Sequence, residues 1–313
     1  MSKVRKPLEN RAQAMYNNNH NEGHQQGVRI KEKIVMKKII SMILALVMLA
    51  ACTVCFAEGE TVLRVGTNPE FAPFEYVGDS GEVEGIDADI IAEIAKDLGM
   101  TVQMESMEFD ALVPALMANQ LDVVIAGMTI TEEKKQSVLF SDPYFTATQV
   151  VIVTEGSAIA TEADLAGKKV GVQLGTTGDL LISDPAYGVA EVARYSKGLD
   201  AAMDLKNGRL DAVVIDTLPA KQFVASLGGL VVKDDILTKA DTESYGIAVK
   251  LEDTELMEKI NASLKRMQED GTFDQIVLKY VEGEDAEGDA AATDAAAEAT
   301  EAPADATEAP AEG

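Results

Sequence analysis

Three groups that can bind an anion follow one another at the end of an apolar run, in the stretch AGMTITEEK. Gly127 and Thr129 offer free backbone N–H groups and a hydroxyl, and Lys134 adds a positive charge. Thr131 is the predicted N-cap of a helix with acids in its first turn. Together these groups favour a site for a carboxylate-sized anion. The alternative is that Lys134 is a solvated surface charge, as Lys135 is expected to be.

A second set of polar residues follows two other apolar runs, AVVID and VGVQ. Asp216 is first of all a predicted N-cap for the next helix. An acid opposite an anion site would also hold the ammonium of a zwitterion while Lys134 holds its carboxylate. Gly175, Thr176 and Thr177 lie in a strand-to-helix turn and could add N–H and hydroxyl donors.

Aromatic residues near these segments could cover a small ligand. Phe71 follows the first predicted strand and is the better candidate, while Phe74 and Tyr76 are expected to pack in the fold. Phe109 is a similar candidate, with core packing as its default role.

Several kinds of chemistry are excluded by composition. Cys52 and Cys55 lie in the leader, His20 and His24 lie further upstream, and residues 58–281 contain no Cys, His or Trp. This excludes Cys/His and Ser/His catalysis and makes a thiolate or imidazole metal site improbable, so neither a metal nor a cofactor is expected. A formal net charge of −26 argues against nucleic-acid binding.

The body alternates apolar strands with amphipathic helices, which predicts an α/β fold with mainly parallel sheets covered by helices. In GIDADIIAEIAKDLG the isoleucines fall on one helical face, and Gly99 ends the helix. In FDALVPALMANQ, Asp110 is the candidate N-cap and Pro114 is placed in the first turn. LDVVIAG is then a buried strand. The later helix residues Leu256, Met257, Ile260, Leu264 and Met267 are predicted to be core.

The two halves of the body are similar. ALMANQLDVVIAG in the first half matches DLKNGRLDAVVID in the second, each reading as a helix, a turn and a buried strand with a polar end. Two such lobes would face each other across a cleft, because ligands of open α/β sheets lie at the carboxyl ends of strands. The alternative is that such similar segments occur in any α/β protein and carry no functional meaning.

Both ends of the chain have special compositions. Residues 36–57 read as a signal peptide, because two lysines precede an apolar run of 13 residues, too short to span a membrane. LAAC resembles the lipobox of bacterial lipoproteins, in which Cys52 would be lipidated and anchor the protein at the membrane; cleavage after Ala57 would instead give a secreted or periplasmic protein. Residues 1–35 are expected to be a non-native or misannotated segment, and the acidic tail 282–313 is predicted to be disordered.

The segments GTNPEFAPFEY, GIDADIIAEIAKDLG, AGMTITEEKKQSVLFSDPYF, GKKVGVQLGTTG, LDAVVID and SYGIAVK, in this order, resemble the amino-acid-binding family of solute-binding proteins that serve ABC importers (family 3). The resemblance implies a two-lobed, type II periplasmic-binding-protein-like fold. It places lobe 1 at 61–145 plus 246–281 and lobe 2 at 149–240. Two crossing strands near 144–148 and 241–245 would form the hinge.

The resemblance also implies which residues bind the ligand: Asn68, Phe71, Phe109, Ala126, Gly127, Thr129, Lys134, Gln173, Thr176, Thr177 and Asp216. Two positions depart from the family pattern. Lys134 stands where an arginine usually grips the α-carboxylate with two parallel bonds. Asn68 stands where aspartate is frequent, which favours a neutral polar amino acid and leaves cystine-like or acidic ligands open.

The implied function is non-catalytic: a monomeric binding protein that captures an amino acid by lobe closure and delivers it to a membrane permease. One alternative is a secreted dehydratase on the same fold, for which only Asp, Glu, Lys or Tyr could serve as acid or base; Glu70 and Glu75 are candidates that nothing singles out. Another is a ligand-sensing or structural surface protein.

Overall fold

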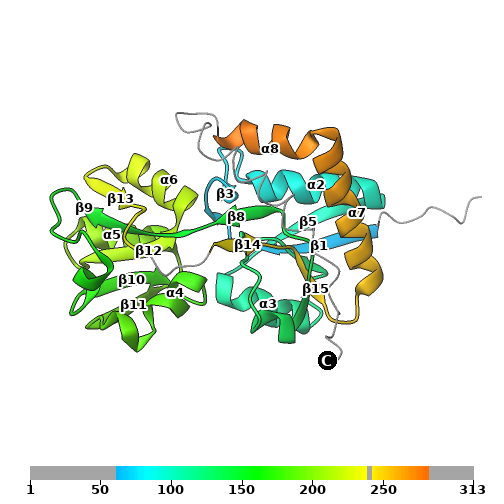
Figure 1. Ribbon diagram of the computed structural model, residues 1–313. Coiled ribbons are helices and arrows are strands. Elements are labelled where there is room, and N and C mark those ends of the chain that lie inside the picture. The colour runs from blue at the N-terminus through cyan, green and yellow to red at the C-terminus, as the bar shows by residue number, and fades with distance from the viewer. Residues whose placement is uncertain (1–60, 238–241, 282–313) are drawn as a thin grey trace, which may run out of the picture. The chain divides into compact units, whose positions relative to one another are not determined.

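A computed structural model describes residues 61–237 and 242–281 and contains two five-stranded sheets, one in each of two lobes (Figure 1). The predicted signal peptide, the lipidation of Cys52 and the disordered tail lie outside the described residues. The lobe limits implied by the resemblance remain predictions.

The first sheet has the strand order β5-β1-β6-β15-β7. Strand β1 pairs in parallel with β5 and β6, whereas β15 runs antiparallel to β6 and β7. The bounds are β5 (Met100–Ser106), β1 (Thr61–Thr67), β6 (Val123–Val124), β15 (Ala248–Lys250) and β7 (Val138–Phe140).

Helices cover both faces of the first sheet (Figure 1). Helices α2 (Ile86–Leu98), α7 (Thr254–Asp270) and α8 (Thr272–Val281) pack together on one face, and α3 (Phe109–Met117) lies on the other. Because successive side chains of a strand point to opposite faces, the sheet contributes apolar side chains to both helical layers. Leu63 and Val65 belong to the cluster under α2, and Val124 belongs to the cluster under α3. As predicted, α2 buries its isoleucines and ends at Gly99, which has a left-handed conformation.

The second sheet repeats this plan with the order β11-β10-β12-β9-β13. Strand β10 is parallel to β11 and β12, and β9 is antiparallel to β12 and β13. The bounds are β11 (Glu191–Tyr195), β10 (Lys169–Gln173), β12 (Ala212–Asp216), β9 (Gln149–Thr154) and β13 (Leu230–Lys233). Helices α5 (Gly198–Lys206) and α6 (Thr217–Leu227) cover one face, and α4 (Thr177–Ile182) packs on β10 and β12. In each sheet, therefore, one of the five strands runs against the other four: β15 in the first sheet and β9 in the second.

Two segments join the sheets. Strands β8 (Phe145–Ala147) and β14 (Glu243–Tyr245) pair antiparallel with each other and pass between the lobes. A small sheet of β2 (Glu70–Phe71), β3 (Glu75–Val77) and β4 (Val83–Glu84) precedes α2, and three short 3-10 helices are η1 (Lys134–Gln136), η2 (Glu162–Leu165) and η3 (Pro185–Tyr187).

Three local predictions are wrong. Pro114 lies in the interior of α3 rather than in its first turn, and the N-cap position is Glu108, not Asp110. The segment after Thr131 forms the 3-10 helix η1 and not an α-helix, although the Thr131 hydroxyl still accepts a hydrogen bond from the Lys134 N–H at 3.2 Å. The hydroxyl needs only one turn of backbone to do this, so a capping residue alone does not fix the length of a helix.

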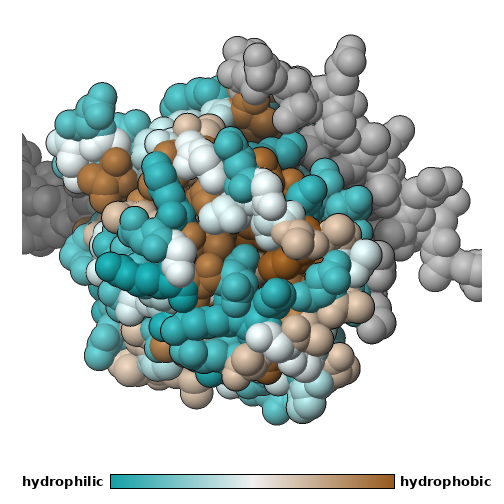
Figure 2. Space-filling model, turned by 90° about the vertical axis from the view of Figure 1, so that its left-hand side faces the viewer, coloured by the Kyte–Doolittle hydropathy of each residue, from teal (hydrophilic) through white to brown (hydrophobic). Residues whose placement is uncertain are grey.

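The surface of the second lobe is mostly hydrophilic on the side turned to the viewer in Figure 2, with hydrophobic side chains visible only between polar ones. The apolar residues of its sheet lie beneath, in two buried clusters. No helix within the two described ranges is both long and apolar enough to cross a membrane.

Candidate ligand-binding site

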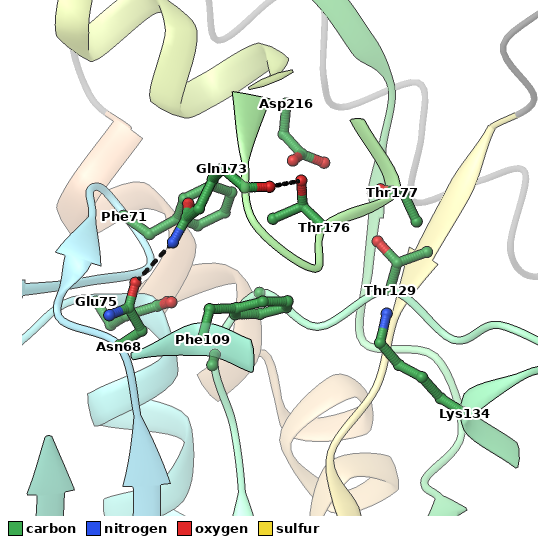
Figure 3. A pocket seen from close by; sticks show the side chains of 12 residues that line it. Asn68, Phe71, Glu75, Phe109, Thr129, Lys134, Gln173, Thr176, Thr177 and Asp216 are labelled. Carbon is green, nitrogen blue, oxygen red and sulfur yellow. Dashed lines mark hydrogen bonds between the residues drawn. The ribbon is translucent and has the colours of Figure 1, made fainter. Parts of the chain in front are cut away.

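One cavity is lined by residues from both lobes (Figure 3). Its lining contains all eleven residues that the sequence analysis proposes as ligand contacts, together with Glu75. The volume of the cavity is only about 10 Å3. The walls are therefore close together, and an amino acid could enter only if they move apart.

Gly127 and Phe71 fit against each other in the wall of the first lobe. Gly127 has φ +49°, and a Cβ atom there would lie 2.8 Å from Phe71 Cε1. The Gly127 N–H is not free as predicted, because it donates a hydrogen bond of 2.7 Å to the buried Asp87 carboxyl group. Asp87 also accepts from the Tyr144 hydroxyl at 2.9 Å. This backbone amide therefore positions the wall and is not a donor for a ligand.

The hydroxyl protons of the cavity threonines are all used inside the protein. Thr129 and Thr177 donate to Glu243 Oε2, at 2.8 and 2.7 Å. Thr176 donates to the Gln173 carbonyl at 2.8 Å and caps α4 by accepting from the Asp179 N–H. The predicted anion donors thus have internal acceptors, and the Gly175 N–H likewise donates to Asp179 at 3.2 Å.

Lys134 is half-buried and directed into the cavity, with its Nζ on the same side as Thr129 (Figure 3). Its Nζ lies 5.9 Å from the centroid of the Phe109 ring. Burial lowers the pKa of Lys134, and the nearby Glu243 acts against that shift. Among the described residues Lys134 makes no ion pair within 4 Å, whereas Lys135 pairs with Glu132 at the surface. Its charge is therefore available to an anionic ligand.

Asp216 ends β12 and is 5% exposed. As predicted, it occupies the N-cap position of α6, although its side chain makes no capping hydrogen bond. Its Oδ1 has no hydrogen-bond partner among the described residues. Burial, followed by repulsion from Glu243, raises the pKa of Asp216 to about 7. A ligand ammonium would satisfy this carboxyl group and stabilise its ionised form.

Asn68 and Gln173 lie at the end of the cavity away from Lys134 (Figure 3). Gln173 Nε2 donates to Asn68 Oδ1 at 2.9 Å and to the Ser196 carbonyl at 3.2 Å. Asn68 Nδ2 in turn donates to the Met107 carbonyl at 2.9 Å. The two amides are thus held in fixed orientations by the backbone of each lobe.

Glu75 lies beside Asn68 and was not predicted as a ligand contact (Figure 3). It is 1% exposed, and its pKa is raised well above the usual value by burial and by the neighbouring Asp87. Burial also raises the pKa of Asp87 to about 7, while its bonds from Gly127 and Tyr144 act against that shift. Because burial disfavours the ionised form of both carboxyl groups, a cation close to Glu75 would favour its ionised form.

Two functional candidates were not predicted as part of a binding site: Glu75, named only as one of two acids that could serve a dehydratase, and Glu243, not named at all. Glu75 stands at an inward position of the short strand β3, where its neighbours Tyr76 and Val77 are progressively more exposed. Glu243 lies on a crossing strand, and its sequence pattern gives no sign that it accepts hydrogen bonds from two threonines of the cavity. Within the described part of the chain, no three His, Cys, Asp or Glu side chains are grouped so that they could hold a metal ion.

Comparisons with known proteins agree with this geometry. The model of the bacterial extracellular solute-binding proteins, family 3, matches residues 63–283. The arginine-binding extracellular protein ArtP of Bacillus subtilis is 33% identical over 260 residues, which cover 80% of this chain and 100% of ArtP. The histidine-binding periplasmic protein of Salmonella typhimurium is 32% identical over 255 residues, covering 78% of this chain and 97% of that protein.

The structure of an ancestral arginine-binding protein bound to glutamine is similar with a TM-score of 0.67 and 43% identity, covering 72% of this chain and 99% of the ancestral one. The two lobes described above therefore form a type II periplasmic-binding-protein fold. The putative ABC transporter arginine-binding protein 2 of Escherichia coli is 33% identical, covering 78% of this chain and 99% of that protein. With a family model that spans nearly all of the described residues, the chain belongs to the bacterial extracellular solute-binding proteins, family 3.

Proposed function

We propose that this chain captures a free amino acid with a cationic side chain between its lobes and delivers it to the membrane permease of an ABC importer. Asp216 would hold the α-ammonium and Lys134 the α-carboxylate. Lobe closure would trap the ligand, since the cavity is too narrow to admit it without opening. The partner permease, a lipid anchor at Cys52 and a monomeric state remain predictions.

The observation that carries the ligand class is the position of Glu75. Phe71 and Phe109 line the cavity between Lys134 and Glu75 (Figure 3). A ligand whose α-groups lie near Lys134 would therefore extend its side chain along the two rings and bring its end to the Glu75 carboxyl group. A guanidinium group there would ionise Glu75 and form charge-assisted hydrogen bonds with it. The arginine and histidine named for the relatives support the same class.

A neutral polar amino acid such as glutamine is the second candidate. Asn68, rather than an acid, lies next to Glu75, and burial raises the pKa of Glu75, which favours its protonated form. An amide side chain could bond to both without transferring a proton. The ancestral relative with bound glutamine supports this reading.

The first experiment is a thermal-shift screen of the full chain, unfolded and refolded to remove bound ligand, against the common amino acids. A ligand at roughly 1,000 times its dissociation constant adds about 4 kcal/mol to the free energy of unfolding, which is a large shift in Tm. A shift with arginine, lysine or histidine supports the proposed class. Shifts only with neutral amino acids would favour the second candidate, and no shift with any amino acid would contradict the function.

A second experiment tests the role of Glu75 directly. Glu75→Gln keeps the shape of the side chain but cannot become negative. We expect this variant to bind L-arginine about tenfold more weakly or worse. The affinity for L-citrulline, which is neutral and nearly the same shape, should fall much less. Glu82→Gln, at an exposed position, is the control. Equal losses of affinity for arginine and citrulline would mean that Glu75 does not distinguish a charged ligand side chain from a neutral one.

A further inference from the structure

Glu243 Oε2 accepts hydrogen bonds from three side chains that belong to different parts of the fold. Thr129 of the first lobe donates at 2.8 Å, Thr177 of the second lobe at 2.7 Å, and Gln149 Nε2 lies at 3.4 Å. Glu243 itself lies on β14, one of the two strands that pass between the lobes. A single carboxylate oxygen therefore lies at the junction of both cavity walls and the hinge.

This arrangement decides what the two threonines can offer a ligand. A hydroxyl group has one proton to donate and two lone pairs that accept. Because the protons of Thr129 and Thr177 are directed at Glu243, only lone pairs remain for the cavity. Thr177 Oγ1 also accepts from Gln149 Nε2 at 3.1 Å, which leaves it one lone pair, whereas Thr129 keeps two.

We propose that Glu243 is a positioning residue that fixes the hydroxyls of Thr129 and Thr177 as acceptors, so that they bind the ammonium of the amino acid and not its carboxylate. This inference rests on the proposed function and adds to it a residue that does not line the cavity. It also reverses the prediction from the sequence, in which the Thr129 hydroxyl was a donor to an anion.

The assignment divides the cavity by charge. Asp216 and the two hydroxyl oxygens form an acceptor set for an ammonium, while Lys134 is the cation left for the carboxylate. An ammonium has three N–H donors, which matches three acceptors. Without Glu243 the hydroxyls would be free to turn their protons toward the cavity and oppose the ammonium.

The test compares two substitutions with opposite expectations. Glu243→Met removes the acceptor, and Glu243→Gln keeps an oxygen that the two hydroxyls and Gln149 would select over the amide nitrogen. The probes are L-arginine and L-glutamine, each paired with its analogue lacking the α-amino group, measured by calorimetry on the full chain. We expect Glu243→Met to raise the Kd for the amino acid about tenfold or more, and the Kd for its desamino analogue less than about threefold. Glu243→Gln should retain most of the affinity of the unchanged protein.

Thr129→Val provides a second variant that does not depend on how β14 tolerates substitution. It removes one acceptor and should show the pattern of Glu243→Met, while the exposed Glu252→Gln should match the unchanged protein. Equal losses for the amino acid and its desamino analogue would overturn the inference. So would a Glu243→Gln protein as weak as Glu243→Met, since the carboxylate would then act through its charge. An unchanged protein that binds neither amino acid would instead contradict the proposed function.

Discussion

Gln173 and Asn68 form a side-chain hydrogen bond of 2.9 Å across the cavity, although 105 positions separate them and each belongs to a different lobe. Both side chains are nearly fully buried. The bond therefore contributes to the arrangement in which the lobes are close together.

Gln173→Leu should therefore lower the affinity for every ligand by a similar factor. The substitution removes the bond between the lobes, so closure becomes less favourable for any cargo. Loss of one hydrogen bond of about 1 kcal/mol corresponds to roughly a fivefold rise in Kd. Calorimetry with L-arginine and L-glutamine would measure it, with the exposed Gln103→Leu as control. A loss confined to one of the two amino acids would show that Gln173 acts by contacting the ligand side chain and not through closure.

Lys134→Ala should abolish detectable amino-acid binding, because Lys134 is the cation directed into the cavity for the α-carboxylate. Lys135→Ala, one position along, should have no effect, since Lys135 is exposed and paired with Glu132. Lys134→Arg should bind at least as well as the unchanged protein, because a guanidinium can hold a carboxylate with two parallel bonds. Titration calorimetry of the three variants would check this order, and normal affinity in Lys134→Ala would disprove the assignment.

Gly127→Ala should reduce both stability and affinity. Its positive φ costs an L-residue about 1–2 kcal/mol. The added Cβ would also lie 2.8 Å from Phe71 Cε1, so the ring would have to move. Gly99→Ala is a matched control, because Gly99 also has positive φ but nothing within 4 Å of the added Cβ. Thermal unfolding and ligand titration of both should show a similar loss of Tm from backbone strain and a loss of affinity only in Gly127→Ala. Equal affinities would mean that Phe71 does not contact the ligand.

The sequence was sufficient wherever one local rule decided the outcome. The apolar spacing and the glycine end of α2 were predictable, and the motif order led to the residues that line one cavity. Local rules failed where distant residues compete for the same group. The Gly127 N–H was expected to be free, but Asp87, 40 positions earlier, accepts its hydrogen bond. The Thr129 proton is directed to Glu243, 114 positions later. Hydrogen-bond direction depends on such pairs, which no single sequence segment contains.

Buried acids were the other part of the site that the sequence could not show. An unpaired buried carboxyl group is costly, so nothing in the short segment FEY indicates that its glutamate is buried. Only the packed structure shows Glu75 next to Asp87 and lining the cavity. The proposed ligand class rests on this residue, whereas the sequence analysis favoured a neutral amino acid because of Asn68.

The stability of the ligand-free protein should depend on Asp216 in a defined pH window. Its pKa is about 7 in the folded state and close to 3.8 in the unfolded state, so between these values the folded protein binds the extra proton. Folding is therefore favoured at low pH, and this contribution is lost as the pH rises from about 4 to about 7, by at most about 1.4 kcal/mol per pH unit. Exposed, paired carboxyl groups with a lowered pKa, such as that of Asp270, change the free energy of unfolding only at pH values below this window.

Asp216→Asn removes this proton, so the Tm difference between the unchanged protein and the variant should grow in favour of the unchanged protein as the pH is lowered from 7.5 to 5, values chosen on either side of about 7. Asp79→Asn, at an exposed position, should leave the slope unchanged. Amino-acid affinity should move the other way. A ligand ammonium stabilises ionised Asp216, so binding releases a proton and the Kd of the unchanged protein should fall as the pH rises toward about 7. Calorimetry in buffers of different ionisation enthalpy measures that proton directly; its absence would mean that Asp216 does not meet the ammonium.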